Sequence, residues 1–218
     1  MKTAIVLGAT GLTGGILLKY LLKDERYDRI KVFGRRHMGM THPKLEEHVL
    51  DLFELEKEKE NFKADEVYCC VGTTKAKTPD LEVYRKVDYG IPVAAAKLAK
   101  QNFIPRLLII SALGVDPDSK FFYNRIKGEM ERDVLQEKVP NTYLFQPSLI
   151  SGERKEQRFF ENLSKKVMKV ANHVLLGPLE KYRSIHPEQI ARAMITVANN
   201  GYPHVRIESD EIQRIAAE

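Results

Sequence analysis

The stretch Ala4–Gly15, AIVLGATGLTGG, is the most informative part of this chain. It begins with four apolar residues, Ala4–Leu7, which have the length and β-branched character of a strand buried on both faces. Three glycines follow at intervals of three: Gly8, Gly11 and Gly14. An apolar run with helical spacing comes next. Strand, glycine turn and helix together form the first half of a βαβ unit.

The glycines of such a turn have mechanical roles. They permit a tight turn, a close approach of backbone to pyrophosphate, and close packing of helix on strand. Phosphate then lies on the free N–H groups of the helix N-terminus, where the helix dipole favours negative charge. A turn that only bends the chain is the alternative, but the flanking strand and helix favour nucleotide binding. We expect the nucleotide to contact Gly8, Thr10, Gly11, Leu12, Thr13 and Gly14.

Strand-like and helix-like runs alternate along the rest of the chain. The strand-like runs are 29–33, 47–50, 66–71, 106–110, 142–145 and 204–208. The helix-like runs are 16–22, 80–86, 92–101, 121–137 and 187–198, with an interruption at Gly90-Ile91-Pro92 between the second and the third. This alternation predicts an α/β Rossmann fold, in which helices cover both faces of a doubly wound, mostly parallel sheet.

Length and composition fit a single domain. The 218 residues are 43% hydrophobic and 30% charged, which is enough to bury a sizeable core. No internal repeat or Pro/Gly/Ser-rich linker divides the chain. We therefore predict one NAD(P)-binding domain over residues 1–218, to which residues 147–218 contribute a small substrate-side region.

Two features bear on compartment and partners. The adjacent cysteines Cys69-Cys70 lie in an apolar run, which excludes a disulfide framework and favours a reducing compartment. No apolar stretch approaches the length that spans a membrane. We therefore expect a cytoplasmic protein without a membrane partner. The net charge of +5 comes from mixed charges, which we interpret as a solvated surface with a few phosphate-binding arginines and not as a nucleic-acid surface.

The end of the second strand-like run indicates which dinucleotide is bound. Folds that prefer NAD place an acidic residue here to bind the ribose 2′-hydroxyl. This chain has Arg35-Arg36 instead. A guanidinium offers a planar fork of donors that fits a 2′-phosphate and keeps its charge. The pattern favours NADP(H), although two solvated arginines in a loop are the alternative.

Two further strand ends carry candidate cofactor contacts. Asp51-Leu52 follows the third strand, where such folds often contact the adenine, although an Asp at a strand exit is also a common helix cap. Val71-Gly72-Thr73-Thr74 ends the fourth strand. Gly72 would let the backbone approach the cofactor and a threonine hydroxyl would lie near its phosphates or ribose, while a simple turn is the alternative.

Ser111, Tyr123 and Lys127 are the candidate catalytic residues. Ser111 ends the fifth strand, and Tyr123 and Lys127 stand four apart in a helical run, so they project from one helix face. A free tyrosine has a pKa of about 10. A nearby ammonium lowers that pKa, so that the phenol exchanges protons near neutral pH, and the serine hydroxyl positions the substrate oxygen. Tyr-x-x-x-Lys alone is a common accident on helices, and the upstream glycine turn favours the catalytic interpretation.

The chain resembles the short-chain dehydrogenase/reductase superfamily over nearly its whole length. The segments that carry the resemblance are GATGLTGG, FGRR, CCVGTTKAKTPD, YRKVDY, SALG and YNRIKGE. Within the superfamily it is most similar to the atypical branch that contains the Tat-interacting metastasis-suppressor oxidoreductase. The resemblance implies a Rossmann fold, NADP(H) binding in which Tyr123 and Lys127 also take part, and a Ser–Tyr–Lys catalytic set at Ser111, Tyr123 and Lys127.

The sequence departs from the superfamily pattern at two places. Asp88 stands where many extended members carry an asparagine, and Gln146-Pro147 stands where many relatives have Arg-Pro. In this scheme Pro147 and Leu149 border the nicotinamide. His186, before the late helix, either contacts the substrate or is a helix-capping or surface histidine, and we prefer the second interpretation.

These observations predict an NADP(H)-dependent oxidoreductase that transfers hydride to a carbonyl or similar group on an unidentified small molecule. A non-catalytic NADP(H)-sensing protein that binds a partner is the alternative from another class. Nucleotide-sugar epimerisation uses the same catalytic residues, but it would usually need a longer substrate domain. No cysteine or histidine spacing suggests a metal site. The polar outer face of the run 121–137 favours a monomer over a dimer.

Overall fold

The structure of the protein is a computed structural model, which describes residues 1–151 and 177–218. Within these residues, one sheet has the strand order β3-β2-β1-β4-β5-β6-β7, and every neighbouring pair is parallel. The strands are β1 (Lys2–Leu7), β2 (Tyr27–Gly34), β3 (Leu45–Val49), β4 (Glu66–Cys69), β5 (Arg106–Ile110), β6 (Asn141–Gln146) and β7 (Arg206–Glu208). The predicted doubly wound parallel sheet is confirmed.

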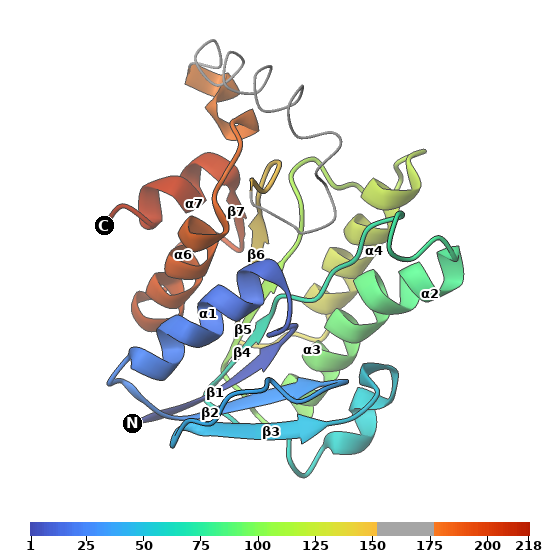
Figure 1. The fold of residues 1–218 in the computed structure, drawn as a ribbon. Coiled ribbons are helices and arrows are strands. Elements are labelled where there is room, and N and C mark those ends of the chain that lie inside the picture. The colour runs from blue at the N-terminus through green and yellow to red at the C-terminus, as the bar shows by residue number, and fades with distance from the viewer. Residues whose placement is uncertain (152–176) are drawn as a thin grey trace.

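Helices cover both faces of this sheet (Figure 1). The helices on one face are α1 (Leu12–Lys23), α6 (Pro187–Asn200) and α7 (Ser209–Ile215). The helices toward the other face are α2 (Leu81–Arg85), α3 (Ile91–Gln101) and α4 (Phe122–Gln136). Two short 3₁₀ helices are η1 (Leu52–Glu58) and η3 (Gly177–Tyr182).

The core forms two layers, and β1 contributes to both. Ala4 and Val6 pack into the cluster on the α1 and α6 side, whereas Ile5 and Leu7 pack into the cluster on the α3 and α4 side. All four side chains are fully buried. Removing a side chain of the size of Val, Ile or Leu from water stabilises the fold by about 1.5–3 kcal/mol. The run is therefore apolar throughout because β1 has no solvent-facing side.

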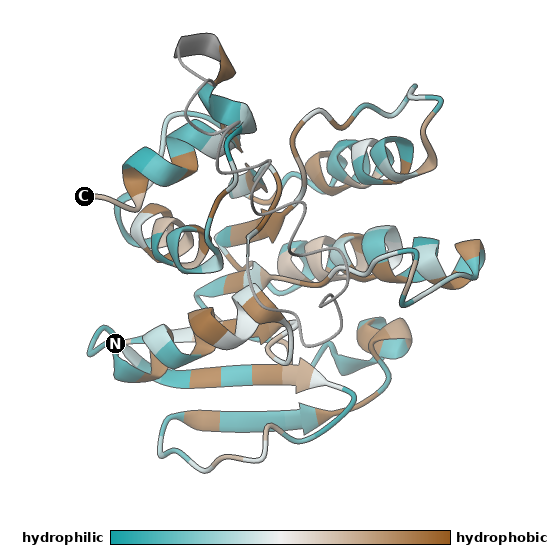
Figure 2. Ribbon diagram, turned by 45° about the horizontal axis from the view of Figure 1, so that its top comes forward, coloured by the Kyte–Doolittle hydropathy of each residue, from teal (hydrophilic) through white to brown (hydrophobic). Residues whose placement is uncertain are grey.

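The edge strand β3 differs from β1 in composition. Its sequence LEEHV is mostly hydrophilic, and Figure 2 shows this strand largely in teal. Charged residues on an edge strand discourage pairing with the edge of another sheet.

Among the described helices, none combines the length and the apolar character that crossing a membrane requires.

The helix between β4 and β5 is continuous, so the predicted interruption at Gly90-Ile91-Pro92 is wrong. A π-helical turn, η2 (Lys86–Gly90), joins α2 to α3, and the Ile91 N–H donates to the Lys86 carbonyl five residues back. Pro92 has no N–H with which to bond the Asp88 carbonyl four residues before it. The chain accommodates this loss by widening one turn, as π-bulges do, and not by ending the helix.

Residues after β6 also contribute to the sheet and its cover. β7 pairs with β6, and α6 packs against α1. Residues 152–176, which belong to the predicted substrate-side region, lie outside the described residues.

Candidate dinucleotide and catalytic site

A cleft of about 640 Å³ lies where the strand order reverses between β1 and β4. This switch point, outside the carboxyl ends of the strands, is where doubly wound sheets bind ligands. The structure brings four predicted segments together here: the glycine turn and the residues after β2, β3 and β4. The predicted cofactor residues that line the cleft are Gly8, Thr10, Gly11, Arg35, Arg36, Asp51, Leu52, Val71, Gly72 and Thr73.

The glycine turn leaves no room for side chains at two of its positions. Gly8 has φ +81°, and a Cβ there would lie 2.7 Å from the Cys70 carbonyl oxygen. A Cβ on Gly14 would lie 2.2 Å from the Gly8 carbonyl oxygen. Gly11 is the N-cap of α1 and supplies no capping side chain, so the first N–H groups of the helix are available to an anion.

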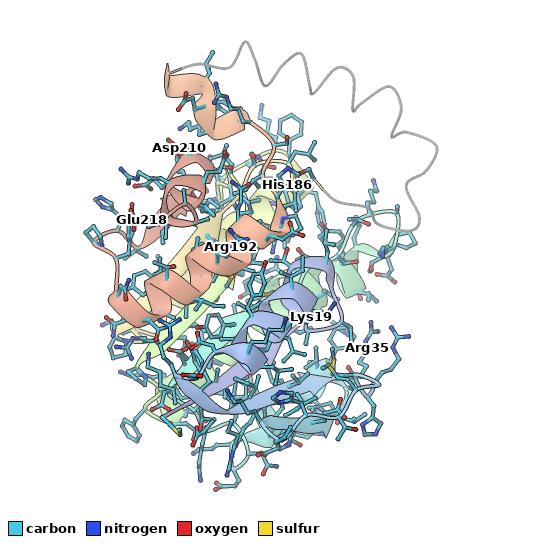
Figure 3. The ribbon with its side chains drawn as sticks, turned by 60° about the vertical axis from the view of Figure 1, so that its left-hand side comes forward. Lys19, Arg35, His186, Arg192, Asp210 and Glu218 are labelled. Carbon is cyan, nitrogen blue, oxygen red and sulfur yellow. The ribbon has the colours of Figure 1, made fainter. Side chains whose placement is uncertain are left out.

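Arg35 and Arg36 follow β2 directly, and both side chains are exposed at the cleft. Figure 3 shows Arg35 at the end of β2. Asp51 also lines the cleft, and its carboxylate accepts a hydrogen bond of 3.0 Å from the Phe53 N–H, which caps η1. The helix-cap interpretation of Asp51 is therefore confirmed, while an adenine contact stays a prediction.

The loop after β4 is held by a contact between two of its own side chains and by Asp88 of η2. The Thr73 hydroxyl lies 2.8 Å from the Thr78 hydroxyl, and the Thr73 N–H donates to the Asp88 carboxylate at 2.8 Å. Sequence reasoning missed that this loop returns to the cleft, where Lys77, Thr78, Pro79 and Asp80 also line the wall. Lys77, the second lysine of TTKAKTPD, was the available signal, since it adds a cation to a cleft predicted to bind phosphate.

Two of the candidate catalytic residues, Lys127 and Ser111, lie at the end of β5. Lys127 is 3% exposed, and its Nζ lies 3.2 Å from Asp88 Oδ1 and donates to the Ile110 carbonyl at 3.4 Å. Ile110 is the neighbour of Ser111, which is 4% exposed and whose Oγ has no hydrogen-bond partner among the residues that the structure describes. Tyr123 lies one turn before Lys127 on α4 and is 42% exposed. A buried hydroxyl without a partner is costly, and a substrate oxygen would satisfy it.

The electrostatics of the site centre on Lys127. Burial disfavours the lysine charge, but the negative charges of the Asp88 carboxylate and of the Tyr123 phenolate outweigh burial, so the pKa of Lys127 is raised above its ordinary value. Burial raises the pKa of the neighbouring Cys69 thiol to about 11, which keeps it in its unreactive thiol form. Burial, with Asp88 and Tyr123 nearby, also raises the pKa of Tyr84.

Asp88 is the site residue whose role sequence reasoning did not anticipate. It was noted only as a departure from asparagine, yet it is 1% exposed and contacts both Lys127 and the loop after β4. Pro92 was the available signal, because a proline four residues after a polar side chain in a helix alters the helical turn that carries it.

The remaining predicted residues lie around this centre. Leu12, Thr13 and Gly14 form the first turn of α1, and Thr74 lies in the loop after β4. Pro147 and Leu149 follow β6, where the Leu113 N–H donates to the Pro147 carbonyl at 3.0 Å and so ties the β5 and β6 loops together. Contacts of these residues with a cofactor stay predictions.

Gln146 and His186 are engaged within the protein. The Gln146 amide donates to the buried Glu131 carboxylate at 2.8 Å. His186 is the N-cap residue of α6, where its N–H donates to the Gln189 side chain at 3.0 Å (Figure 3). Its position agrees with the preferred helix-cap interpretation. Over the described ranges, no three His, Cys, Asp or Glu side chains are grouped to hold a metal ion.

Relatives with curated sequences cover most of the chain. It is 34% identical over 202 residues to protein FMP52 of Meyerozyma guilliermondii, covering 89% of this chain and 84% of the relative. It is 32% identical over 173 residues to protein FMP52-1 of Scheffersomyces stipitis, covering 77% and 76%. It is 30% identical over 169 residues to protein HTATIP2 of Rattus norvegicus, covering 76% and 69%. No family model matches the chain.

The names of the FMP52 relatives correct one prediction. These relatives are named mitochondrial, so the predicted cytoplasmic location is wrong. The prediction failed because adjacent cysteines in an apolar strand exclude a disulfide framework without distinguishing one reducing compartment from another.

Solved structures with a similar fold include UDP-N-acetylglucosamine 4-epimerase from Methanobrevibacter ruminantium M1. That likeness has a TM-score of 0.71 and 14% identity, and covers 98% of this chain and 80% of the epimerase. The enzyme WbmH of Bordetella bronchiseptica, in complex with NAD+, has a TM-score of 0.68 and 16% identity, covering 96% and 76%. These likenesses support the Rossmann architecture, and the sequence relatives supply the family. The chain belongs to the atypical short-chain dehydrogenase/reductase family that includes HTATIP2 and the FMP52 proteins.

Proposed function

We propose that this protein is an NADP(H)-dependent oxidoreductase that transfers hydride to a carbonyl or similar group of a small molecule. The observation that carries the proposal is the buried hydroxyl of Ser111, which has no hydrogen-bond partner within residues 1–151 and 177–218. It lies at the strand end that Lys127 contacts through the Ile110 carbonyl. A purely structural serine at this depth would have a partner. Family membership and structural neighbours determined with NAD support a nicotinamide dinucleotide as the cofactor.

The cleft residues fit such a cofactor. The glycine turn leaves the α1 N-terminus open to a pyrophosphate, and Gly8 and Gly14 keep the backbone free of side chains there. Arg35 and Arg36 suit a 2′-phosphate, because their planar donors match its oxygens and retain their charge. The nicotinamide, when bound, supplies or accepts the hydride.

Three side chains transfer the proton of the reaction and position the substrate oxygen. Ser111 donates a hydrogen bond to the substrate oxygen and holds it in place. Tyr123 transfers its phenolic proton to that oxygen during reduction and recovers it in the reverse direction. Lys127 carries the positive charge that stabilises the phenolate, which lowers the cost of this transfer.

Two measurements test the proposal in sequence. Titrations with NADPH and with NADH, monitored by the fluorescence of the reduced cofactor, should show tighter binding of NADPH. The chain contains no tryptophan whose fluorescence would interfere with this signal. A screen of aldehydes, ketones and quinones should then find substrates that oxidise NADPH. Tight NADPH binding without turnover across a broad panel would instead favour a non-catalytic sensor that binds a partner, and absence of dinucleotide binding would contradict the proposal.

A further inference from the structure

Asp88 joins two parts of the site with one carboxylate. Its Oδ1 lies 3.2 Å from Lys127 Nζ on α4, and its Oδ2 accepts a 2.8 Å hydrogen bond from the Thr73 N–H in the loop after β4. Asp88 is 1% exposed, so neither interaction is shared with bulk solvent. The catalytic helix and a wall of the cofactor cleft are therefore connected through this side chain.

The helix that carries Asp88 has an altered geometry at this position. η2 is π-helical from Lys86 to Gly90, and Pro92 removes the donor that an α-helix would offer to the Asp88 carbonyl. Single π turns occur frequently at functional sites. The altered turn thus coincides with the residue that contacts both Lys127 and Thr73.

Lys127 depends on this carboxylate for its charge. Its surroundings are apolar enough that burial alone favours the neutral amine, and a buried lysine without a partner loses its proton readily. Among the described residues, Asp88 is the one carboxylate within ion-pair distance of Lys127. The other titratable groups that act on this pair are Tyr123 on α4, Tyr84 on α2 and Cys69 on β4, and none is a carboxylate.

We propose that Asp88 is the positioning residue of this site: it holds Lys127 in the charged form beside Tyr123 and fixes the Thr73 loop against the cleft. This inference rests on the proposed function, which assigns Lys127 to the catalytic set. Asp88 acts through its two partners and contacts neither the substrate nor the reacting atoms. Its carboxylate is matched to both tasks, since one oxygen faces the ammonium and the other the backbone donor.

Two substitutions separate the two interactions. Asp88→Asn keeps an oxygen that can accept from the Thr73 N–H but presents an amide to Lys127. Asp88→Ala removes both interactions. Glu129→Gln is the matched control, because it neutralises a carboxylate on α4 that pairs with Arg85 and does not contact Lys127.

The direct readout is a pH titration of Lys127. It is monitored by NMR of protein labelled with ¹³C at lysine Cε, and the Lys127 signal is assigned with Lys127→Met. In the parent protein Lys127 should stay charged above the ordinary lysine pKa of about 10.4. In Asp88→Asn and Asp88→Ala its proton affinity should fall by about tenfold or more, while Glu129→Gln leaves it unchanged. An Asp88→Asn variant in which Lys127 titrates as in the parent would overturn the proposal.

Cofactor affinity reports the second interaction. NADPH should bind Asp88→Ala about three- to tenfold more weakly than the parent, because the loop has lost one hydrogen bond, whereas Asp88→Asn should bind it nearly as well. Equal affinity of Asp88→Ala and the parent would contradict the loop-fixing role. If the variants do not fold, the titration of Lys127 in the parent protein tests the proposal by itself, because a Lys127 pKa below the ordinary lysine value would contradict it. The titration needs neither cofactor nor substrate, so its failure is distinguishable from a failure of the proposed function.

Discussion

Arg35 and Arg36 are the residues on which the cofactor preference depends. Replacing both with alanine should weaken NADPH binding by about 10- to 100-fold, because charged donors to the 2′-phosphate are lost. NADH, which lacks that phosphate, should bind the variant about as well as the parent. Arg29→Ala removes an exposed arginine of β2 that pairs with Glu46, and should change neither affinity. If parallel fluorescence titrations show that the double substitution weakens NADPH and NADH binding equally, the assignment of Arg35 and Arg36 to the 2′-phosphate is wrong.

Single residues also show where sequence reasoning is sufficient. The cleft positions of Gly8, Arg35 and Gly72 were predictable because each lies within three residues of a strand end, and the ends of parallel strands meet at one edge of the sheet. The role of Asp88 was not predictable, because it depends on which way a π turn directs a side chain. The direction of the Asp88 side chain depends on the missing N–H at Pro92 and on the burial of Lys127. Hydrophobic periodicity indicates neither of these.

The contact between the glycine turn and α1 is the critical packing feature at the level of elements. Gly14→Ala would place a Cβ 2.2 Å from the Gly8 carbonyl, where backbone and not a flexible side chain must move. We expect a loss of about 1–3 kcal/mol in the free energy of unfolding, with weaker NADPH binding. Gly90→Ala is the control, because nothing lies within 4 Å of a Cβ there and alanine favours helix by up to about 1 kcal/mol. Denaturant unfolding curves that rank both variants equally would disprove this packing argument.

Element boundaries were predictable where apolar runs end at turn residues. The run 106–110 matches β5 in full, and the apolar stripe over 121–137 matches α4 within one residue at each end. The helix break at Gly90-Ile91-Pro92 was predicted wrongly, because proline in a helix is usually disruptive and a π turn is the rarer outcome. The short helix α7 has little periodicity of its own and is recognisable mainly by its packing on α6.

The molecule as a whole carries a second buried polar cluster, at the strand ends opposite the cleft. The Tyr27 and Tyr68 hydroxyls lie 3.1 Å apart, and Tyr68 donates to the Glu66 carboxylate at 2.8 Å. Asn199 of α6 donates to the Tyr27 hydroxyl at 2.9 Å and ties that helix to the sheet. Burial, with Glu66 nearby, raises the pKa of both tyrosines.

This cluster predicts how stability depends on pH. In the unfolded chain these tyrosines ionise near pH 10, whereas the folded protein keeps their protons to higher pH. The stabilisation is therefore complete below about pH 10 and is lost above it, by about 1.4 kcal/mol per pH unit for each such tyrosine. Tyr68→Phe should reduce that alkaline slope, while Tyr182→Phe, at an exposed tyrosine, should retain it. The free energy of unfolding is measured with urea from about pH 9 to 11.5. If its slope against pH is the same in both variants as in the parent, the buried tyrosines are not its cause.

The measurement that tests the account most directly compares NADPH oxidation by the parent and by Tyr123→Phe, with a carbonyl substrate found by the screen. Tyr202→Phe is the control, because it removes a hydroxyl that bonds Glu211, away from the cleft-lining residues. Tyr123→Phe should bind NADPH as the parent does and lose about 10²- to 10⁴-fold in turnover, since the phenol supplies the proton. Tyr202→Phe should keep both properties. Turnover by Tyr123→Phe at the parent rate would contradict the role of Tyr123 as the acid and base of a reductase.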